Sequence, residues 1–126
     1  MRSGLPQITR NSMRIRRGDI VLVNLDPVIG SEQGKTRPAV VIQNDIGNEF
    51  SSTTIIAPVT TTVYSKKFPT NVEIDATTSP LKSPSTILLN QIRTIDKKRI
   101  LKIYGPVAPK TMKEVNEAIM DSLGLA

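Results

Sequence analysis

An arginine directly before a proline is the first feature of this sequence that could support chemistry. Arg37 and Pro38 lie in the stretch GSEQGKTRPAVVI, residues 30–42. A proline disfavours helical backbone at the residue before it, so Arg37 is restrained in an extended conformation where a loop enters a strand. A guanidinium held in this way suits contact with a phosphate through two parallel N–H groups. The alternative is a surface ion pair with an acid such as Glu32.

The same stretch has the composition of a nucleotide-binding loop, but its spacing excludes that function. Gly30 and Gly34 enclose three residues, whereas the nucleotide loop has four residues between its glycines and continues into a helix. Pro38 and the β-branched residues after it predict a strand. A phosphate therefore has no helix N-terminus to bind here.

Thr60 is the second candidate for chemistry. It ends the run Ile55–Val59, where its hydroxyl could project from the rim of a sheet. Threonine is also an ordinary strand residue, and Thr61 and Thr62 are near-equal candidates. From the pattern alone, an ordinary strand residue is the stronger interpretation of Thr60.

The segment Tyr64–Phe68 places two aromatic residues around Lys66 and Lys67. Aromatic rings that stack on bases, with cations for the backbone, are typical of proteins that bind single strands. The alternative is that the rings only anchor the loop to the rest of the protein.

Two other sets of charged residues are better interpreted as solvated surface than as binding sites. Glu73 and Asp75 share one face of an alternating strand and could bind a hard metal, but a solvated face is the stronger interpretation. The densest basic run could meet nucleic-acid phosphates, although most such runs are only solvated surface. It comprises Arg93, Lys97, Lys98, Arg99 and Lys102.

The residue types that are missing exclude several kinds of site. The 126 residues contain neither cysteine nor histidine, which excludes disulfides, thiolate metal sites and the commonest general base. We expect no metal and no cofactor. No apolar run is long enough to span a bilayer, so no membrane association is expected.

The charge of the chain is concentrated at its N-terminus. The net charge is +6, but five arginines and no acid lie in residues 1–17, and the remaining chain has 12 basic against 11 acidic side chains. We expect residues 1–13 to be a disordered basic tail, and 14–126 to form a single domain. A polyanion would have to bind local basic groups of that domain.

Hydrophobic alternation predicts several short strands and one terminal helix. Asp26-Pro27 ends the first strand, 44–48 has turn chemistry, and the longest strand needs a bulge near Asn90–Gln91 to restore its parity. Thr111–Glu114 fits a capping box at the start of the helix. The expected fold is mainly β, a small barrel with a C-terminal α-helix. The expected strands span residues 19–25, 38–43, 53–59, 71–76, 86–95 and 101–104.

Four stretches together resemble the MazF/PemK toxins of prokaryotic toxin–antitoxin systems. They are RRGDIVLVNLDPVIGSEQGKTRPAVVIQNDIGN, PVT at 58–60, PTNVEID and ILLNQIRTIDKKRI, and the resemblance covers about residues 14–124. The resemblance implies an SH3-like barrel of the MazF/CcdB type, assembled as a homodimer. It implies a cytoplasmic, metal-independent, sequence-selective endoribonuclease that cuts single-stranded RNA, usually mRNA, to 2′,3′-cyclic phosphate and 5′-hydroxyl ends.

The resemblance also implies roles for individual residues. Arg37 and Thr60 would be catalytic, and the 28–36 loop would be repositioned by RNA or antitoxin. A cognate antitoxin would inhibit the protein, and operator DNA would be bound only through the antitoxin complex. The RNA groove would be lined by Ser31, Gln33, Asn90 and Gln91, and the candidate single-strand loop would add Lys66 and Lys67.

Two departures from the family pattern narrow the chemistry. Some relatives have histidine where this chain has Ser31, and an acid where it has Asn90. Mechanisms that use those groups as acid or base cannot operate here, which favours an arginine and a threonine acting on the phosphate. The alternative functions are a gyrase-poisoning toxin of the same fold and a non-catalytic nucleic-acid-binding module.

Overall fold

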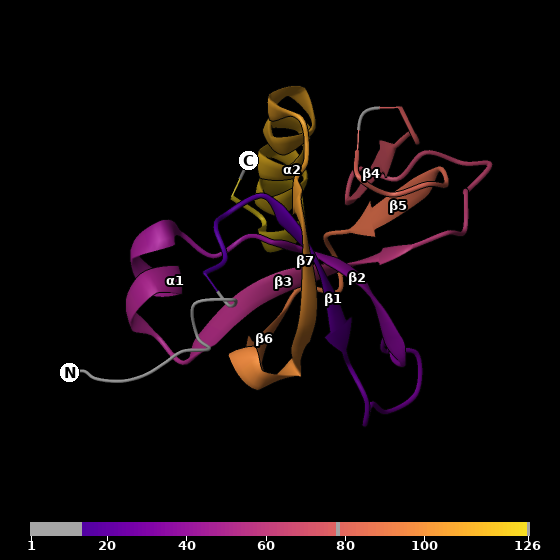
Figure 1. Cartoon of the computed structure of the whole chain (residues 1–126). Coiled ribbons are helices and arrows are strands. Elements are labelled where there is room, and N and C mark those ends of the chain that lie inside the picture. The colour runs from indigo at the N-terminus through magenta and orange to yellow at the C-terminus, as the bar shows by residue number, and fades with distance from the viewer. Residues whose placement is uncertain (1–13, 78, 126) are drawn as a thin grey trace.

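The computed structural model describes residues 14–77 and 79–125, in which a bent antiparallel sheet is followed by one long helix (Figure 1). The predicted tail, residues 1–13, lies outside the described residues. In chain order the elements are β1 (Asp19–Asn24), β2 (Thr36–Val41), α1 (Asp45–Phe50), β3 (Thr53–Thr60), β4 (Asn71–Ile74), β5 (Ser85–Leu88), β6 (Arg93–Asp96), a 3₁₀ turn η2 (Lys97–Arg99), β7 (Ile100–Pro106) and α2 (Pro109–Leu123). None of the helices in these ranges is both long and apolar enough to cross a membrane.

The predicted fold class, mainly β with a C-terminal helix, is confirmed. The strand order is β4-β5-β3-β2-β1-β7, and β6 pairs with β3 beside this path. Within the described part of the chain, β4 and β7 each pair with one neighbour and not with each other. The strands therefore form a bent antiparallel sheet of the SH3-like kind, but this sheet does not close into a complete barrel.

Two apolar clusters lie on opposite faces of the central strands, because successive side chains in a strand alternate between faces. On one face α2 packs through Val115 and Ala118 against a cluster that includes Ile20. On the other face, Val21 and Ile56 belong to a second cluster that the curled sheet encloses. β1 is buried on both faces, as predicted.

One turn predicted from the sequence is a helix in the structure. Asn44, Asp45 and Gly47 are turn residues, but Asn44 instead caps α1 by accepting a hydrogen bond from the Gly47 N–H at 2.8 Å. The helix buries Asn48, whose Oδ1 accepts from the buried Thr54 hydroxyl at 2.7 Å. Turn formers and helix caps share the same residue types, so the local pattern could not decide between them.

The long strand predicted over 86–95 is wrong. The structure has β5 and β6 separated by a turn at Leu89–Asn90, so the polar pair 90–91 lies in a connection and not in a bulge. The cause is β3, which pairs with β6 over Thr53–Ile56 and with β5 over Val59–Thr60. Pro58, which has no N–H to donate, lies where the partner changes.

The C-terminal helix is confirmed, but it starts before the predicted capping box. α2 begins at Pro109, with Ala108 as its cap residue and no side-chain cap. Thr111 is buried inside the first turn and does not cap the helix. Proline in the first helical turn, where its missing N–H has no partner to lose, explains this start.

The short cap predicted at Asp96 is confirmed, since its side chain accepts from Lys98 N.

Arg17 ties the N-terminal segment to two helices. Its N–H donates to Asp45 Oδ1 at 2.7 Å, its Nε donates to the carbonyl of Ile42 at 2.8 Å, and its Nη2 donates to Asn116 Oδ1 at 2.8 Å. The hydrogen bond from the Arg17 backbone, aided by Asn48 and by the positive charges of Arg16 and Arg17, lowers the pKa of Asp45 below its ordinary value. Asp45 therefore stays ionised to a lower pH than a free aspartate.

Candidate RNA-cleavage site

Arg37 and Thr60 lie on neighbouring strands at the same end of the sheet. The β2–β3 ladder pairs Ala39 with Pro58 and Val41 with Ile56. Continuing this antiparallel register by two residues in each strand brings Arg37 opposite Thr60. Because alternate residues share a face, both side chains lie on the face of the sheet that holds Ile56 and Val41.

The Arg37 guanidinium is oriented by the loop before it. Its Nε donates to the carbonyl of Gly34 at 2.8 Å, and the side chain is half-buried. The predicted alternative, an ion pair with Glu32, does not form: Glu32 Oε1 instead accepts a hydrogen bond from the Ile29 N–H at 2.8 Å. No other acid in the described ranges pairs with Arg37. Its two terminal nitrogens are therefore available to an anion.

The Thr60 hydroxyl is held by its own turn. Thr62 N donates to Thr60 Oγ1 at 3.2 Å, and the Thr60 hydroxyl donates to Thr62 Oγ1 at 3.2 Å. The turn is fixed to β5, because the Thr86 hydroxyl donates to the carbonyl of Thr62 at 2.9 Å. Thr61 and Thr62 follow the strand and are exposed, whereas Thr60 is half-buried at its end. The hydroxyl of Thr60 is therefore held at a defined place, and it can donate to a ligand by exchanging its bond to Thr62 for one to that ligand.

A pocket of about 440 Å³ opens on the same side of the sheet. The pocket contains polar residues from two segments of the chain, 32–33 and 90–93, together with apolar residues that form part of its wall. Its lining residues are Pro27, Glu32, Gln33, Pro58, Asn90, Gln91, Ile92 and Arg93. Pro58 lies two residues before Thr60 on β3 and on the same face of the strand, but Arg37 and Thr60 themselves are not among the lining residues of the pocket.

The structure brings together the four polar residues that the resemblance assigns to an RNA groove. Gln33 N donates to Gln91 Oε1 at 3.3 Å, and Gln91 Nε2 contacts the carbonyl of Ser31 at 3.5 Å. Asn90, which is exposed, precedes Gln91 and also lines the pocket. The β1–β2 loop is thus linked to the β5–β6 turn across the pocket.

Lys66 and Lys67 are exposed in the loop after β3, and neither lines the pocket. The two rings that flank them pack on each other: the centroids of Tyr64 and Phe68 are 6.1 Å apart, in an edge-to-face arrangement. This packing favours the interpretation that the rings anchor the loop. Contact of the two lysines with RNA remains a prediction.

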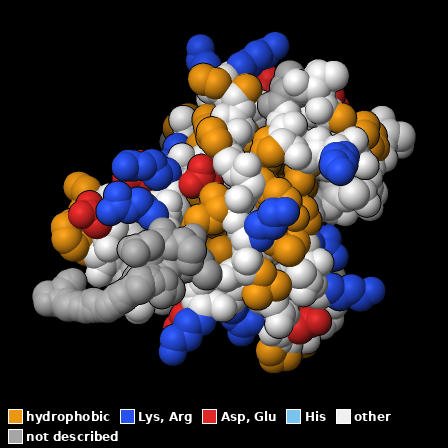
Figure 2. All heavy atoms as spheres, viewed as in Figure 1, with side chains coloured by type: hydrophobic (Ala, Val, Ile, Leu, Met, Phe, Trp, Pro, Cys, Tyr) orange, Lys and Arg blue, Asp and Glu red, His pale blue; other side chains and the backbone are white. Residues whose placement is uncertain are grey.

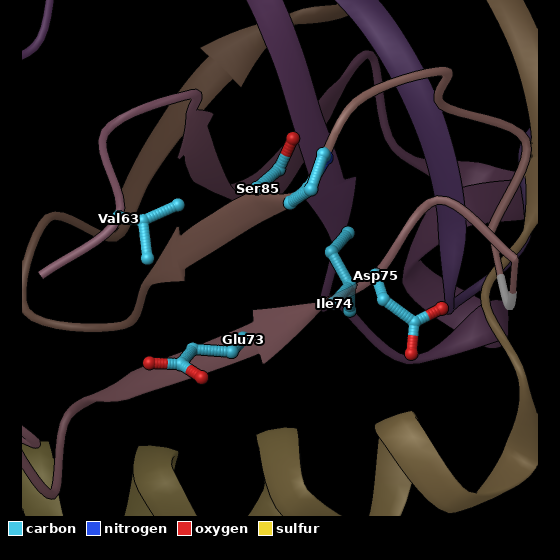
Figure 3. Close-up of a pocket in the computed structure, with 6 residues that line it drawn as sticks. Val63, Glu73, Ile74, Asp75 and Ser85 are labelled. Carbon is cyan, nitrogen blue, oxygen red and sulfur yellow. The ribbon is translucent and has the colours of Figure 1, made fainter.

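A second pocket, of about 230 Å³, lies on β4 and β5, among residues that include Glu73, Asp75 and Ser85. Figure 3 shows the carboxylates of Glu73 and Asp75 pointing away from each other. Both residues are exposed, as predicted for a solvated strand face. Arg37 and Thr60 are not among its lining residues.

The predicted basic run does not form one patch. Lys97 donates to the carbonyl of Asn48, Arg99 Nη1 donates to the carbonyls of Asn24 and Asp26 at 3.0 and 2.6 Å, and Lys102 lies 4.9 Å from the ring centroid of Tyr104. Figure 2 shows the lysine and arginine side chains in separate groups on the visible face. Arg93 is the one member of the run that lines the larger pocket.

Gly34 couples the loop to Arg37, and we predict that Gly34→Ala lowers activity. A Cβ at Gly34 would lie 2.6 Å from Val28 Cγ2 and 2.7 Å from Asp26 Oδ1, so the loop must shift and the carbonyl that orients Arg37 must move with it. We expect RNA cleavage to fall about tenfold, with overpacking costing about 1–3 kcal/mol of stability. Initial cleavage rates and thermal melting test this. Unchanged cleavage by Gly34→Ala would contradict the role assigned to the loop.

Comparisons with known proteins identify the family of the chain. Residues 16–123 match the family described as the PemK-like, MazF-like toxin of type II toxin–antitoxin systems. "Endoribonuclease MazF" of Staphylococcus saprophyticus is 51% identical over 111 residues, which cover 88% of this chain and 92% of that protein. "Endoribonuclease EndoA" of Bacillus subtilis is 49% identical over 113 residues, covering 90% and 97%.

Solved structures share the fold. MazF from Deinococcus radiodurans superposes with a TM-score of 0.75 at 25% identity, covering 87% of this chain and 96% of that one. A mycobacterial endoribonuclease in complex with its cognate antitoxin has a TM-score of 0.72 at 22% identity, covering 89% and 97%, and so supports the fold alone. Given the family match across most of its length, this chain belongs to the PemK-like, MazF-like toxin family of type II toxin–antitoxin systems.

Proposed function

We propose that the protein is an endoribonuclease toxin that cuts single-stranded RNA, chiefly mRNA, sequence-selectively and without a metal. The products are a 2′,3′-cyclic phosphate and a 5′-hydroxyl end. The observation that supports the proposal is the β2–β3 register: continued by two residues, it puts the Arg37 guanidinium, which has no acidic partner among the described residues, opposite the Thr60 hydroxyl. Two relatives that are 51% and 49% identical to this chain are named endoribonucleases, which supports RNA cleavage.

The chemistry suits a protein without histidine, because RNA provides its own nucleophile. The 2′-oxygen forms a bond to phosphorus while the bond from phosphorus to the 5′-oxygen breaks. The 2′-hydroxyl loses a proton, and the departing 5′-oxygen gains one. Negative charge builds on the non-bridging oxygens in the transition state, and preorganised donors aimed at that charge are the largest contribution an enzyme can make.

We assign Arg37 and Thr60 the role of stabilising the negative charge on the non-bridging oxygens. The Gly34 carbonyl holds Nε of Arg37 and leaves the terminal nitrogens to donate to two phosphate oxygens. Thr60 turns its hydroxyl from Thr62 to the phosphate when substrate binds. An arginine does not lose its proton at physiological pH, so Arg37 stabilises charge and does not act as a base.

The pocket beside this pair is assigned to base recognition. Ser31, Gln33, Asn90 and Gln91 offer hydroxyl and amide groups, which hydrogen-bond the exposed edges of unpaired bases. Because Gln91 is bonded to the β1–β2 loop, binding of a base that replaces this bond also changes the position of the loop. Lys66 and Lys67 are assigned to the RNA backbone farther along the strand.

The proposed partners are RNA, a second copy of the chain and a cognate antitoxin. Solved relatives include endoribonucleases or MazF proteins bound to antitoxin, such as the MazE–MazF complexes from Deinococcus radiodurans. An acidic antitoxin with a disordered tail would bind local basic groups of the domain, because residues 18–126 have 12 basic against 11 acidic side chains. We further propose that the complex, and not the toxin alone, binds operator DNA, and that the protein acts in the cytoplasm.

Incubation of the purified protein with a long RNA in excess EDTA tests the proposal. We expect discrete cuts, 5′ ends that polynucleotide kinase labels without prior phosphatase treatment, and 3′ ends that resist ligation until the cyclic phosphate is opened and the resulting phosphate is removed. Intact RNA would contradict the proposal, and cuts that EDTA abolishes would contradict its metal independence. Intact RNA together with trapped gyrase–DNA complexes would favour the gyrase-poisoning alternative.

A further inference from the structure

Arg93 lines the larger pocket, whereas the other members of the basic run do not. It is the first residue of β6 and pairs with Ile56 of β3, on the same face as the Arg37–Thr60 pair. Its side chain is half-buried and lines the pocket beside Gln91. The basic residues after it are on η2 or β7 and do not line the pocket.

The guanidiniums of Arg93 and Arg37 are both attached to the stem of the β1–β2 loop. Arg93 Nη1 donates to the carbonyl of Leu25 at 3.0 Å. Leu25 in turn donates its N–H to the carbonyl of Lys35 at 2.9 Å, which closes the stem. Arg37 Nε donates to the carbonyl of Gly34, the residue before Lys35, at 2.8 Å. Two cations are therefore held at one loop stem, one from β6 and one from β2.

Neither cation has an acidic partner in the parts of the chain that the structure describes. Glu32 also lines the pocket, but its Oε1 accepts from the backbone of Ile29. A half-buried cation without a paired acid has a raised free energy, and an anion bound to it lowers that free energy. Arg93 commits one terminal nitrogen to the Leu25 carbonyl, so most of its five N–H donors remain for a ligand.

Arg99 is a useful comparison for Arg93, because it binds backbone carbonyls at the same loop stem. Its Nη1 donates to the carbonyls of Asn24 and Asp26, which flank Leu25, and it does not line the pocket. Both arginines therefore brace the end of β1, and only Arg93 is also open to the pocket. The two differ in access to a ligand more than in their backbone contacts.

We infer that Arg93 binds a phosphate of the RNA strand that neighbours the phosphate acted on by Arg37 and Thr60. This inference rests on the proposed function. Arg93 is thus a substrate-binding residue that sets the position of the strand in the groove, because a second fixed phosphate contact fixes which linkage faces Arg37.

The test uses a short RNA that carries a 2′-deoxy substitution at the mapped cut site, so that it binds without being cleaved. Fluorescence anisotropy measures its Kd over a range of KCl concentrations for wild type, Arg93→Gln, Arg93→Lys and Arg99→Gln. For a single strand, each phosphate contact contributes about 0.7 to the slope of log K against log salt. We expect Arg93→Gln to lower that slope by about 0.7 and to weaken binding about tenfold at low salt.

The other variants separate binding from structural support. Arg99→Gln should keep the wild-type slope, and Arg93→Lys should keep the slope while losing several-fold in affinity because the planar fork is gone. In cleavage assays Arg93→Gln should raise KM more than it lowers kcat. The inference is overturned if Arg93→Gln keeps the wild-type slope, or, should that variant not fold, if Arg93→Lys loses thermal stability but binds RNA as wild type does. Failure of the wild-type protein to bind RNA would instead reject the proposed function.

Discussion

Replacing Arg37 with alanine is expected to lower kcat/KM for RNA cleavage by at least about 100-fold, or about 3 kcal/mol of transition-state stabilisation. The half-buried guanidinium donates one hydrogen bond to the Gly34 carbonyl and has no acidic partner in the described chain. The fold therefore depends little on it, and the transition state depends on it strongly. Cleavage rates and thermal melting of the same preparation measure both effects.

Arg37→Lys is the control that keeps the positive charge but removes the planar guanidinium. Lysine keeps the positive charge but cannot form two parallel hydrogen bonds to a phosphate, so we expect it to recover only a small part of the activity. A Tm of Arg37→Ala that falls in proportion to its activity would show that the arginine supports the fold. Such a result would remove the basis of the catalytic assignment.

The second large effect is expected in the core. Ile20 on β1 is fully buried in the cluster that α2 covers, and Ile→Ala substitutions at such positions remove about 2–5 kcal/mol of stability. β1 pairs with both β2 and β7, so a cavity beside it weakens the packing that aligns Arg37 with Thr60. Urea denaturation at one fixed protein concentration measures the free energy of unfolding.

Ile29→Ala is the matched control for Ile20→Ala. Ile29 is 81% exposed in the β1–β2 loop, so its loss should change the free energy of unfolding by no more than about 0.5 kcal/mol. Equal destabilisation by the two substitutions would mean that the assignment of Ile20 to the core and of Ile29 to the surface is wrong.

Strand positions were predictable where the alternation of side chains was strong. The β1, β2, β3 and β4 segments appear close to their predicted ranges, and the parity of β2 and β3 sets the faces of Arg37 and Thr60. The register that pairs these two strands was not readable, because it depends on the 44–52 connection. That connection looked like a turn and is instead α1, with Asn44 as its cap.

Contacts between distant segments explain what sequence reasoning missed. The break between β5 and β6 follows from the change of partner along β3, which no local pattern reports. Asn90 and Gln91 were found as polar residues that interrupt a strand, but the hydrogen bond between Gln91 and Gln33 joins residues 58 positions apart. Arg93 was visible only as part of a basic run, since its bond to Leu25 joins residues 68 positions apart.

A double-mutant cycle on the single-turnover cleavage rate tests the central claim, that Arg37 and Thr60 act on the same phosphate. The four proteins are wild type, Arg37→Ala, Thr60→Val and the double variant. If both groups stabilise one transition state, the loss in the double variant is smaller than the product of the two single losses by at least about tenfold. Losses that multiply, or a double variant that still cleaves at the wild-type rate, would contradict it.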